Sequence, residues 1–330
     1  MSLLSPIDLG ILHIKNRIVF PPITSRTAND NGEASPQLIK RYAALAENVG
    51  IIIVEQAFVS QDGRSLQKQL DISSDENIPS LKKLTDAIHE KGSKAILQLN
   101  HAGRWTTSKV TGQQTIAPSP IPEKKDAETP RKATLEDIDR IGNAFAEAAI
   151  RSLKVGFDSV EIHCAHFFLN SQFLSPLSNH RSDEYGGSIE NRMRFPIEVA
   201  KKVVDAIPNV PVFCRLGVTD MLEGGLKLED GLKVARQLEK VGIAVIDVSA
   251  GLGGIQPQNL QDRVQGFFIP YAIAVKKVVQ IPVIGVGGIK DPVFADSLVN
   301  QGKTDFVAIG RALTSNPNWA KEAYSTLTTS

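Results

Sequence analysis

Short apolar segments alternate with longer amphipathic segments along almost the whole chain. The apolar segments are rich in valine and isoleucine, and the segments between them repeat apolar residues at helical spacing. Alternation of this kind predicts parallel strands joined by helices, and eight such units favour a closed (β/α)8 barrel over an open sheet. The expected strands are residues 18–24, 51–59, 94–100, 159–163, 210–216, 244–249, 282–286 and 306–309.

The segments around these strands agree with a single barrel domain over residues 1–330. Residues 3–15 alternate polar and apolar positions around a glycine, which predicts a β-hairpin that caps the N-terminal end of the barrel. Thr134 and Asp137 form a capping-box pattern at the start of a long helix. We therefore expect an α/β fold, a TIM barrel with an N-terminal hairpin and long loops on its C-terminal face.

Three connections are far longer than the few residues usual between a strand and its helix. Residues 105–131 follow the third strand and include four prolines, which predicts a lid or a wall of a substrate site, with a disordered surface loop as the alternative. Residues 167–190 carry enough aromatic and aliphatic side chains to predict a packed loop. Residues 251–266 form the third long connection.

Composition and charge narrow the classes of partner. The 330 residues are 42% hydrophobic with a net charge of +1, and no Lys/Arg run is long enough to predict nucleic-acid or membrane binding. The start lacks a leader pattern, and no run approaches the roughly 20 apolar residues that span a bilayer. We expect a cytoplasmic protein with a small-molecule partner, in which Cys164 and Cys214 are buried thiols. A homo-oligomer is compatible with this composition.

Glycines and an arginine follow the last two expected strands. Gly287 and Gly288 come after the seventh strand, and Gly310 and Arg311 come after the eighth. Barrels of this class often bind phosphate at these two loops, where glycine lets backbone N–H groups approach and a guanidinium adds a charge-assisted partner. Together they favour a phosphate site, although glycine at such a turn can also serve only the turn geometry.

Two polar side chains interrupt otherwise apolar strands. Gln98 and Arg215 would each cost several kcal/mol if they were buried without a partner. A structural pair between the arginine and a carboxylate would remove that cost. Alternatively, both side chains point to the barrel mouth, where an amide can bind a heterocycle edge and an arginine can stabilise an anionic ring.

His163 and His166 stand where the fourth expected strand ends. Positions i and i+3 of a regular strand face opposite sides, so both rings reach one site only if the backbone bends just beyond His163. Two N–H donors that converge there would bind and polarise a carbonyl, a nitro group or an oxyanion. A zinc site and two purely structural histidines are the alternatives, and no clear third zinc ligand lies nearby in the sequence.

These residues stand among motifs that resemble the old yellow enzyme family, FMN-dependent oxidoreductases on a (β/α)8 barrel, and especially its shorter bacterial branch. The resemblance covers essentially the full length. The motifs are Asn16-Arg17-Ile18-Val19 with Pro22, His101-Ala102-Gly103-Arg104, Ser175-Pro176-Leu177-Ser178-Asn179, Tyr185-Gly186-Gly187-Ser188, Glu190-Asn191-Arg192 and Ile309-Gly310-Arg311.

The resemblance implies that FMN lies over the barrel mouth and is reduced by NADPH or NADH. A hydride would then pass from flavin N5 to an electron-poor alkene such as an enone, a nitroalkene or a maleimide. His163 and His166 would be the catalytic pair that binds the substrate oxygen. The implied cofactor-binding residues are Pro22, Ile23 and Thr24 along the ring, Gln56, Gln98 and Arg215 at its polar edge, and Gly287, Gly288, Gly310 and Arg311 at the phosphate.

Two expected substrate-binding positions depart from the family pattern. The second residue after the second histidine is commonly a tyrosine that protonates the alkene carbon, but here it is Phe168, which has no proton to donate. Arg26 stands where relatives often present an aromatic residue. Its charge predicts a preference for carboxylate-bearing substrates, and a surface salt bridge is the alternative.

The missing tyrosine leaves other reactions open. A flavin dehydrogenase or demethylase that oxidises an amine or an alcohol needs no proton donor at that position. A metal-dependent barrel hydrolase that uses the two histidines, and a flavin-binding protein without turnover, are further alternatives. The sequence contains no cysteine cluster, so we do not expect one of the larger iron–sulfur reductases.

Overall fold

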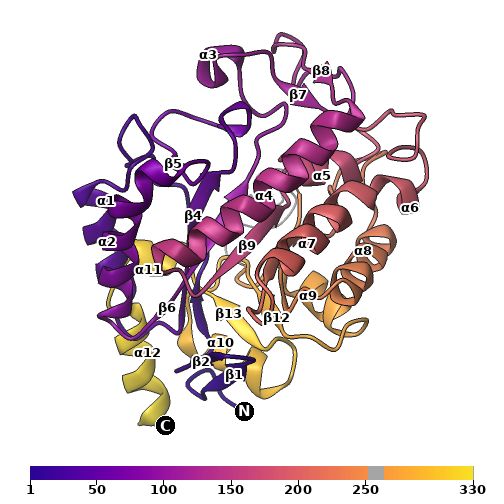
Figure 1. Cartoon of the computed structure of the whole chain (residues 1–330). Coiled ribbons are helices and arrows are strands. Elements are labelled where there is room, and N and C mark those ends of the chain that lie inside the picture. The colour runs from indigo at the N-terminus through magenta and orange to yellow at the C-terminus, as the bar shows by residue number, and fades with distance from the viewer. Residues whose placement is uncertain (252–263, 330) are drawn as a thin grey trace.

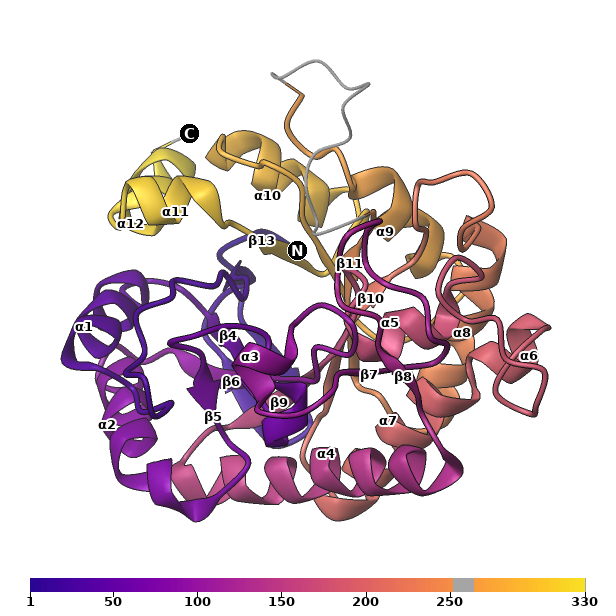
Figure 2. The same cartoon turned by 90° about the horizontal axis from the view of Figure 1, so that it is seen from above.

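The computed structural model describes residues 1–251 and 264–329. Within these residues, eight parallel strands form a ring that β3 and β4 close, and the helices surround that ring in Figure 2. The predicted (β/α)8 barrel is therefore confirmed. In the order of the ring, the strands are β3 (Ile18–Phe20), β13 (Phe306–Ala308), β12 (Val283–Gly285), β11 (Val245–Ser249), β10 (Phe213–Gly217), β9 (Ser159–Cys164), β6 (Lys94–Asn100) and β4 (Ile51–Phe58).

Helices connect the strands and cover the outside of the barrel (Figure 1). The longer ones are α1 (Pro36–Leu45), α2 (Ile78–His89), α4 (Leu135–Val155), α7 (Arg194–Ala206), α8 (Leu228–Lys240), α9 (Ile269–Lys276), α10 (Pro292–Asn300) and α12 (Trp319–Thr328). The short ones are α3 (Ser108–Thr111), α5 (Leu169–Leu174), α6 (Ile189–Arg192) and α11 (Arg311–Ser315), with 3-10 turns at Gln61–Gly63 and Asp75–Asn77. In the part of the chain that the structure describes, no helix is long and apolar enough to cross a membrane.

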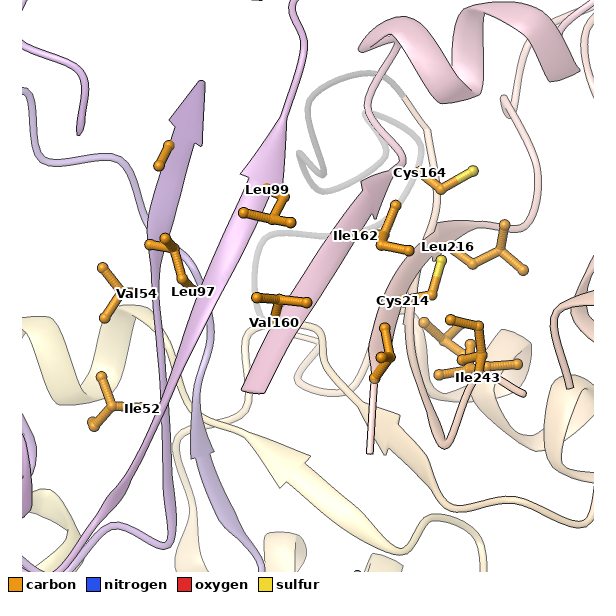
Figure 3. Close-up of a cluster of buried hydrophobic side chains, with 14 of the residues drawn as sticks. Ile52, Val54, Leu97, Leu99, Val160, Ile162, Cys164, Cys214, Leu216 and Ile243 are labelled. Carbon is orange, nitrogen blue, oxygen red and sulfur yellow. The ribbon is translucent and has the colours of Figure 1, made fainter. Parts of the chain in front are cut away.

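The pleat of the strands divides the buried side chains into two layers, because successive residues point to opposite faces. Ile51 and Ile53 face the barrel interior, where they form a cluster with residues such as Phe213. Ile52 and Val54 belong to the larger outer cluster that packs against the helices. Figure 3 shows this outer layer across four neighbouring strands, including the free thiols Cys164 and Cys214, both buried as predicted.

Prolines shorten two of the predicted strands. The first strand was expected over residues 18–24 but ends at Phe20, because Pro21 and Pro22 have no N–H to donate to the sheet. The fifth strand was expected from residue 210 and begins at Phe213, after Pro211. The early end of β3 leaves Pro22, Ile23 and Thr24 in the loop that follows it.

The two ends of the barrel are closed differently (Figure 1). At the N-terminal end, β1 (Ile7–Leu9) and β2 (Leu12–Ile14) form the predicted antiparallel hairpin, and it packs Leu9 and Leu12 on the interior cluster. At the other end lies the insert after β6, in which β7 (Ile116–Ala117) pairs with β8 (Arg131–Lys132). A short strand, β5 (Leu70–Asp71), adds to the edge of β4.

The insert packs on the loop after β9, so it is folded rather than a disordered surface loop. Arg181 Nη1 donates to the carbonyl oxygens of Ala133 and Pro118, at 2.6 and 3.2 Å. The Ser119 hydroxyl accepts from the amide of His180 at 2.8 Å. In the view of Figure 2, the insert crosses over the ends of the barrel strands. Its function as a lid stays a prediction.

The two remaining loop expectations differ in outcome. The loop of residues 167–190 is packed, since every residue of α5 is buried. The connection 251–266 falls largely on residues 252–263, which lie outside the described residues.

The capping box is confirmed, because Thr134 Oγ1 accepts from the Asp137 amide at 3.1 Å and the Asp137 carboxylate accepts from the Thr134 amide at 2.9 Å.

Candidate active site

The two histidines lie side by side because the backbone bends directly after β9. The strand ends at Cys164, and His166 and Phe167 then adopt left-handed conformations with φ of 61° and 62°. This region costs a residue with a side chain about 1–2 kcal/mol, which the burial of Phe167 helps to offset. The bend, which the sequence required for both rings to reach one site, brings His163 Nε2 to 3.0 Å from His166 Nδ1.

The histidines form part of a hydrogen-bonded chain. His166 Nε2 lies 2.7 Å from the hydroxyl of Ser249, the last residue of β11, and Asn170 donates to the carbonyl of His163 at 3.0 Å. Burial, together with the positive charge of Arg215, lowers the pKa of both rings well below the usual value, so both are neutral at pH 7. Among the described residues, only His163 Nδ1 of the four ring nitrogens lacks a partner.

Below the histidines, the barrel interior holds a second polar layer. Gln98 Nε2 donates to Glu161 Oε1 at 2.9 Å, and Arg215 Nε lies 3.4 Å from Asp247 Oδ2. All four residues are buried. Gln98 and Arg215 each have a carboxylate partner, as the structural interpretation requires. Arg215 also lies directly opposite His163 in the pairing of β9 with β10, as a position in the site requires. The two interpretations are therefore not exclusive.

A β-bulge in β4 turns the side chain of Gln56 from the outer face of the strand toward the barrel interior. By alternation, Gln56 would share the outer face with Ile52 and Val54, but the pairing of β4 with β6 shifts between Val54 and Ala57. Gln56 Oε1 accepts from Asn100 Nδ2 at 2.5 Å, and Gln56 Nε2 lies 3.4 Å from Thr24 Oγ1. The structure therefore brings the predicted residues Thr24 and Gln56 together through contacts that strand alternation alone does not provide.

Glu55, beside this bulge, fixes the loop that carries Thr24 and Arg26. Its carboxylate accepts from both the amide and the hydroxyl of Ser25, at 2.8 and 2.6 Å. Arg26 itself has a left-handed backbone with φ of 57° and an exposed side chain. It forms no ion pair with any other residue in the described ranges, so the structure gives no support there for the salt-bridge alternative.

The two expected phosphate loops lie close together, with little room for a side chain at their glycines. A Cβ on Gly288 would lie 2.8 Å from Arg311 Nη2 and 2.9 Å from the Phe267 ring. A Cβ on Gly310 would lie 3.0 Å from Ile23. The glycines thus keep backbone open beside a guanidinium, and the loops after β12 and β13 adjoin the loop after β3. This corner and the polar residues of the barrel end have the chemistry that the phosphate and the ring edge of FMN would require.

Other residues of the family-like motifs are structural. His101 is buried with its Nε2 3.5 Å from Asp62, whose second oxygen accepts from Arg140 of α4 at 2.6 Å. Burial alone would raise the pKa of Asp62, but the hydrogen bonds from His101, Arg140 and Ser60 outweigh burial and lower it. This network ties the loops after β4 and β6 to α4.

In the described ranges, no group of three or more His, Cys, Asp or Glu could hold a metal ion.

Comparison with known proteins identifies the family. The model of the NADH:flavin oxidoreductase / NADH oxidase family, an FMN family, matches residues 2–330. The chain belongs to that family. The predicted resemblance and its cofactors, FMN and a nicotinamide nucleotide, agree with this result.

Similar proteins in this family differ in length. The NADH oxidase of Thermoanaerobacter brockii is 40% identical over 98% of this chain, but the chain spans only 50% of that protein. The NADPH dehydrogenase of Bacillus subtilis is 35% identical over 99% of this chain and 96% of its own length. The old yellow enzyme homologue from Zymomonas mobilis has a TM-score of 0.86 and 28% identity over 99% of this chain and 93% of its own.

Several members of this family site were not predicted from the sequence. They share one signal: near their C-terminal ends, the neighbouring strands β6 and β9, and β11 on the far side of β10, each carry two inward polar residues two positions apart. These pairs are Gln98 and Asn100, Glu161 and His163, and Asp247 and Ser249. Residues two positions apart on a strand face the same side, so these pairs would have suggested one polar layer at the barrel mouth.

Ser249→Ala tests the hydrogen-bonded chain of histidines. We expect both rings to be neutral single tautomers from pH 6 to 8, because their pKa values are lowered and each ring is held by a partner. Removing the hydroxyl leaves His166 Nε2 without its partner, so His166 should show mixed tautomers and the protein should lose about 1 kcal/mol of stability. Ring ¹⁵N shifts in histidine-labelled protein, which has six histidines, measure this. Unchanged His166 shifts would contradict the assignment, and Ser171→Ala, outside the chain, is the control.

Proposed function

We propose that this protein is an FMN-dependent oxidoreductase that oxidises NADPH or NADH and reduces the electron-poor double bond of a small molecule. The observation that carries the proposal is the neutral pair His163 and His166 beside Arg215, at the same barrel end as the glycine and arginine corner. Bound FMN would supply the hydride chemistry, taking a hydride from the nucleotide and giving it to the second substrate.

The residues of this chain would contribute in three ways. His163 and His166, neutral at pH 7, each have one N–H. If the bond between the two rings and the bond of His166 to Ser249 were exchanged for bonds to the carbonyl or nitro oxygen of the substrate, these N–H groups would stabilise the negative charge that grows there. Arg215, always charged, would favour negative charge on a ring beside it. Gln56 and Gln98 present amide groups to the polar edge of such a ring, and Gly288 with Arg311 would hold its phosphate.

Phe168 determines which version of the reaction fits best. Its ring lies 4.6 Å from the His163 ring, centroid to centroid, at the edge of the same site. Because it carries no exchangeable proton, protonation of the alkene carbon would depend on water, and reduction would be slow. The same absence favours the second candidate, oxidation of an amine or alcohol, in which no proton is delivered there.

An anaerobic titration tests the proposed function. The purified protein should be yellow, bleach on addition of NADPH or NADH, and recover its colour on addition of an enone, a nitroalkene or a maleimide. The panel should include one enone as its acid and as its ester, because exposed Arg26 is proposed to favour a carboxylate. A protein that bleaches but is reoxidised by none of these alkenes would contradict alkene reduction, and failure to bleach would favour substrate oxidation or flavin storage.

Phe168→Tyr tests the missing proton donor. The added hydroxyl should speed reoxidation by cyclohexenone about 10-fold or more, because a positioned acid typically contributes 10²–10⁴-fold to a proton transfer. Flavin reduction by NADPH needs no such donor and should change little. Stopped-flow absorbance measures both half-reactions, and Phe168→Leu is the matched control. No gain in the reoxidation rate would show that the donor does not limit the reaction.

A further inference from the structure

The barrel interior holds two carboxylates around one arginine. Glu161 and Asp247 are both fully buried, and Arg215 stands on the strand between theirs. Asp247 lies directly opposite Arg215 in the pairing of β10 with β11, whereas Glu161 lies one residue pair deeper, opposite Gln98 and Phe213. The closest contact between Arg215 and either acid is the one to Asp247, at 3.4 Å.

The hydrogen bonds of this cluster do not satisfy two carboxylates. Glu161 Oε2 and both oxygens of Asp247 have no hydrogen-bond partner among the described residues, and Glu161 Oε1 accepts only from Gln98. A buried carboxylate is stable only with a counter-charge or several donors. One guanidinium can neutralise one carboxylate, so a second negative charge would be uncompensated.

The remaining neighbours supply no other charge. On the strands around Glu161 and Asp247, the other titratable groups are His163, His166, Cys164 and Cys214, and burial keeps both histidines neutral. The inward positions of β12 and β13 are apolar at this level, with Ile284 and Phe306. Among the residues that the structure describes, Arg215 is therefore the single positive charge that faces the two acids.

We propose that Glu161 and Asp247 hold one proton between them, that Glu161 carries it, and that Asp247 alone is the anionic partner that positions Arg215. Burial and the negative charge of Asp247 both raise the pKa of Glu161, in the direction that this arrangement requires. Neutral Glu161 still accepts from the amide of Gln98 and so positions it. Both acids are positioning residues, which act on the flavin site through Gln98 and Arg215.

The consequence for the proposed function is a controlled charge at the flavin site. With one proton on the pair, Arg215 and Asp247 sum to zero, and reduction of the ring adds the only net negative charge. With no proton, a second negative charge would oppose reduction. The pair holds its proton at neutral pH and loses it as pH rises through the raised pKa, so the flavin potential should fall more steeply at alkaline pH.

Infrared spectroscopy tests the proton without reference to catalysis. The C=O stretch of protonated carboxyls is measured on the full chain as purified, in H2O and in D2O. We expect Glu161→Gln to remove the intensity of one carboxyl at neutral pH. Asp247→Asn should remove the same intensity, because Glu161 then ionises to pair with Arg215. Arg215→Met should add the intensity of one further protonated carboxyl, since both acids are then protonated.

A matched control separates this pair from other buried acids. Glu55→Gln changes a buried acid that accepts two hydrogen bonds from Ser25 and lies on β4, which pairs with neither β9 nor β11, so it should leave the Glu161 intensity in place. Unchanged intensity in Glu161→Gln would overturn the proposal. If Arg215→Met does not fold, the two amide variants decide the question alone.

The pH profile of the flavin potential tests the consequence. Wild type should show the additional alkaline fall, and Glu161→Gln, which cannot gain the second charge, should lack it. Parallel profiles would overturn the role of the pair in the flavin site. The proposed function is tested separately. If infrared spectroscopy detects the protonated Glu161 but NADPH does not reduce the bound flavin, the proposed function is refuted and the shared proton is not.

Discussion

The whole site depends on one constraint, the exclusion of water from the interior of a closed barrel. A polar side chain that points inward must find its partner on another strand, because no solvent is present to replace it. At the lower level the interior is apolar, with residues such as Ile53 and Phe213, and the hairpin seals it. At the upper level, β6, β9, β10 and β11 carry inward polar side chains, and contacts such as those of Gln98 with Glu161 and of Arg215 with Asp247 join neighbouring strands.

The fold could be predicted from the sequence because the alternation of apolar and amphipathic segments is a local property. The predicted strand boundaries were most in error beside Pro21 and Pro211. Proline is also a local signal, and ending each predicted strand at the proline would have brought the boundary close to the observed one. The bulge in β4 was different. Alternation puts Gln56 on the outer face, and only the register against β6, set by residues more than 40 positions away, turns it inward.

The candidate site was predicted in part for the same reason. His163, His166, Gln98 and Arg215 attract notice because each is polar in an apolar segment. Their partners stand on other strands: Ser249 lies 83 residues after His166, and Asp247 lies on the strand that follows the one of Arg215. A sequence does not state which side chains of separate strands meet. Phe168 is the opposite case, since its meaning comes from what relatives have at that position and not from its own contacts.

Under the proposed function, a fixed set of donors would surround a flavin, and Phe168 would alter the supply of one proton. Phe168 packs beside His163 without extending the hydrogen-bonded chain, and that chain ends at Ser249. In that proposal the distinctive chemistry would concern the substrate side of the flavin, whereas the residues proposed to bind the cofactor would follow the family pattern.

The most direct test of this account is the binding of FMN to the apoprotein, followed by quenching of flavin fluorescence. The account predicts one FMN per chain, and binding of riboflavin that is weaker by about 10-fold or more, because the loss of phosphate removes the charge-assisted contacts at Gly288 and Arg311, at about 1.4 kcal/mol per factor of ten. Equal affinity for FMN and riboflavin would contradict the phosphate corner. No binding of either would contradict the central claim that the polar end of this barrel is a flavin site.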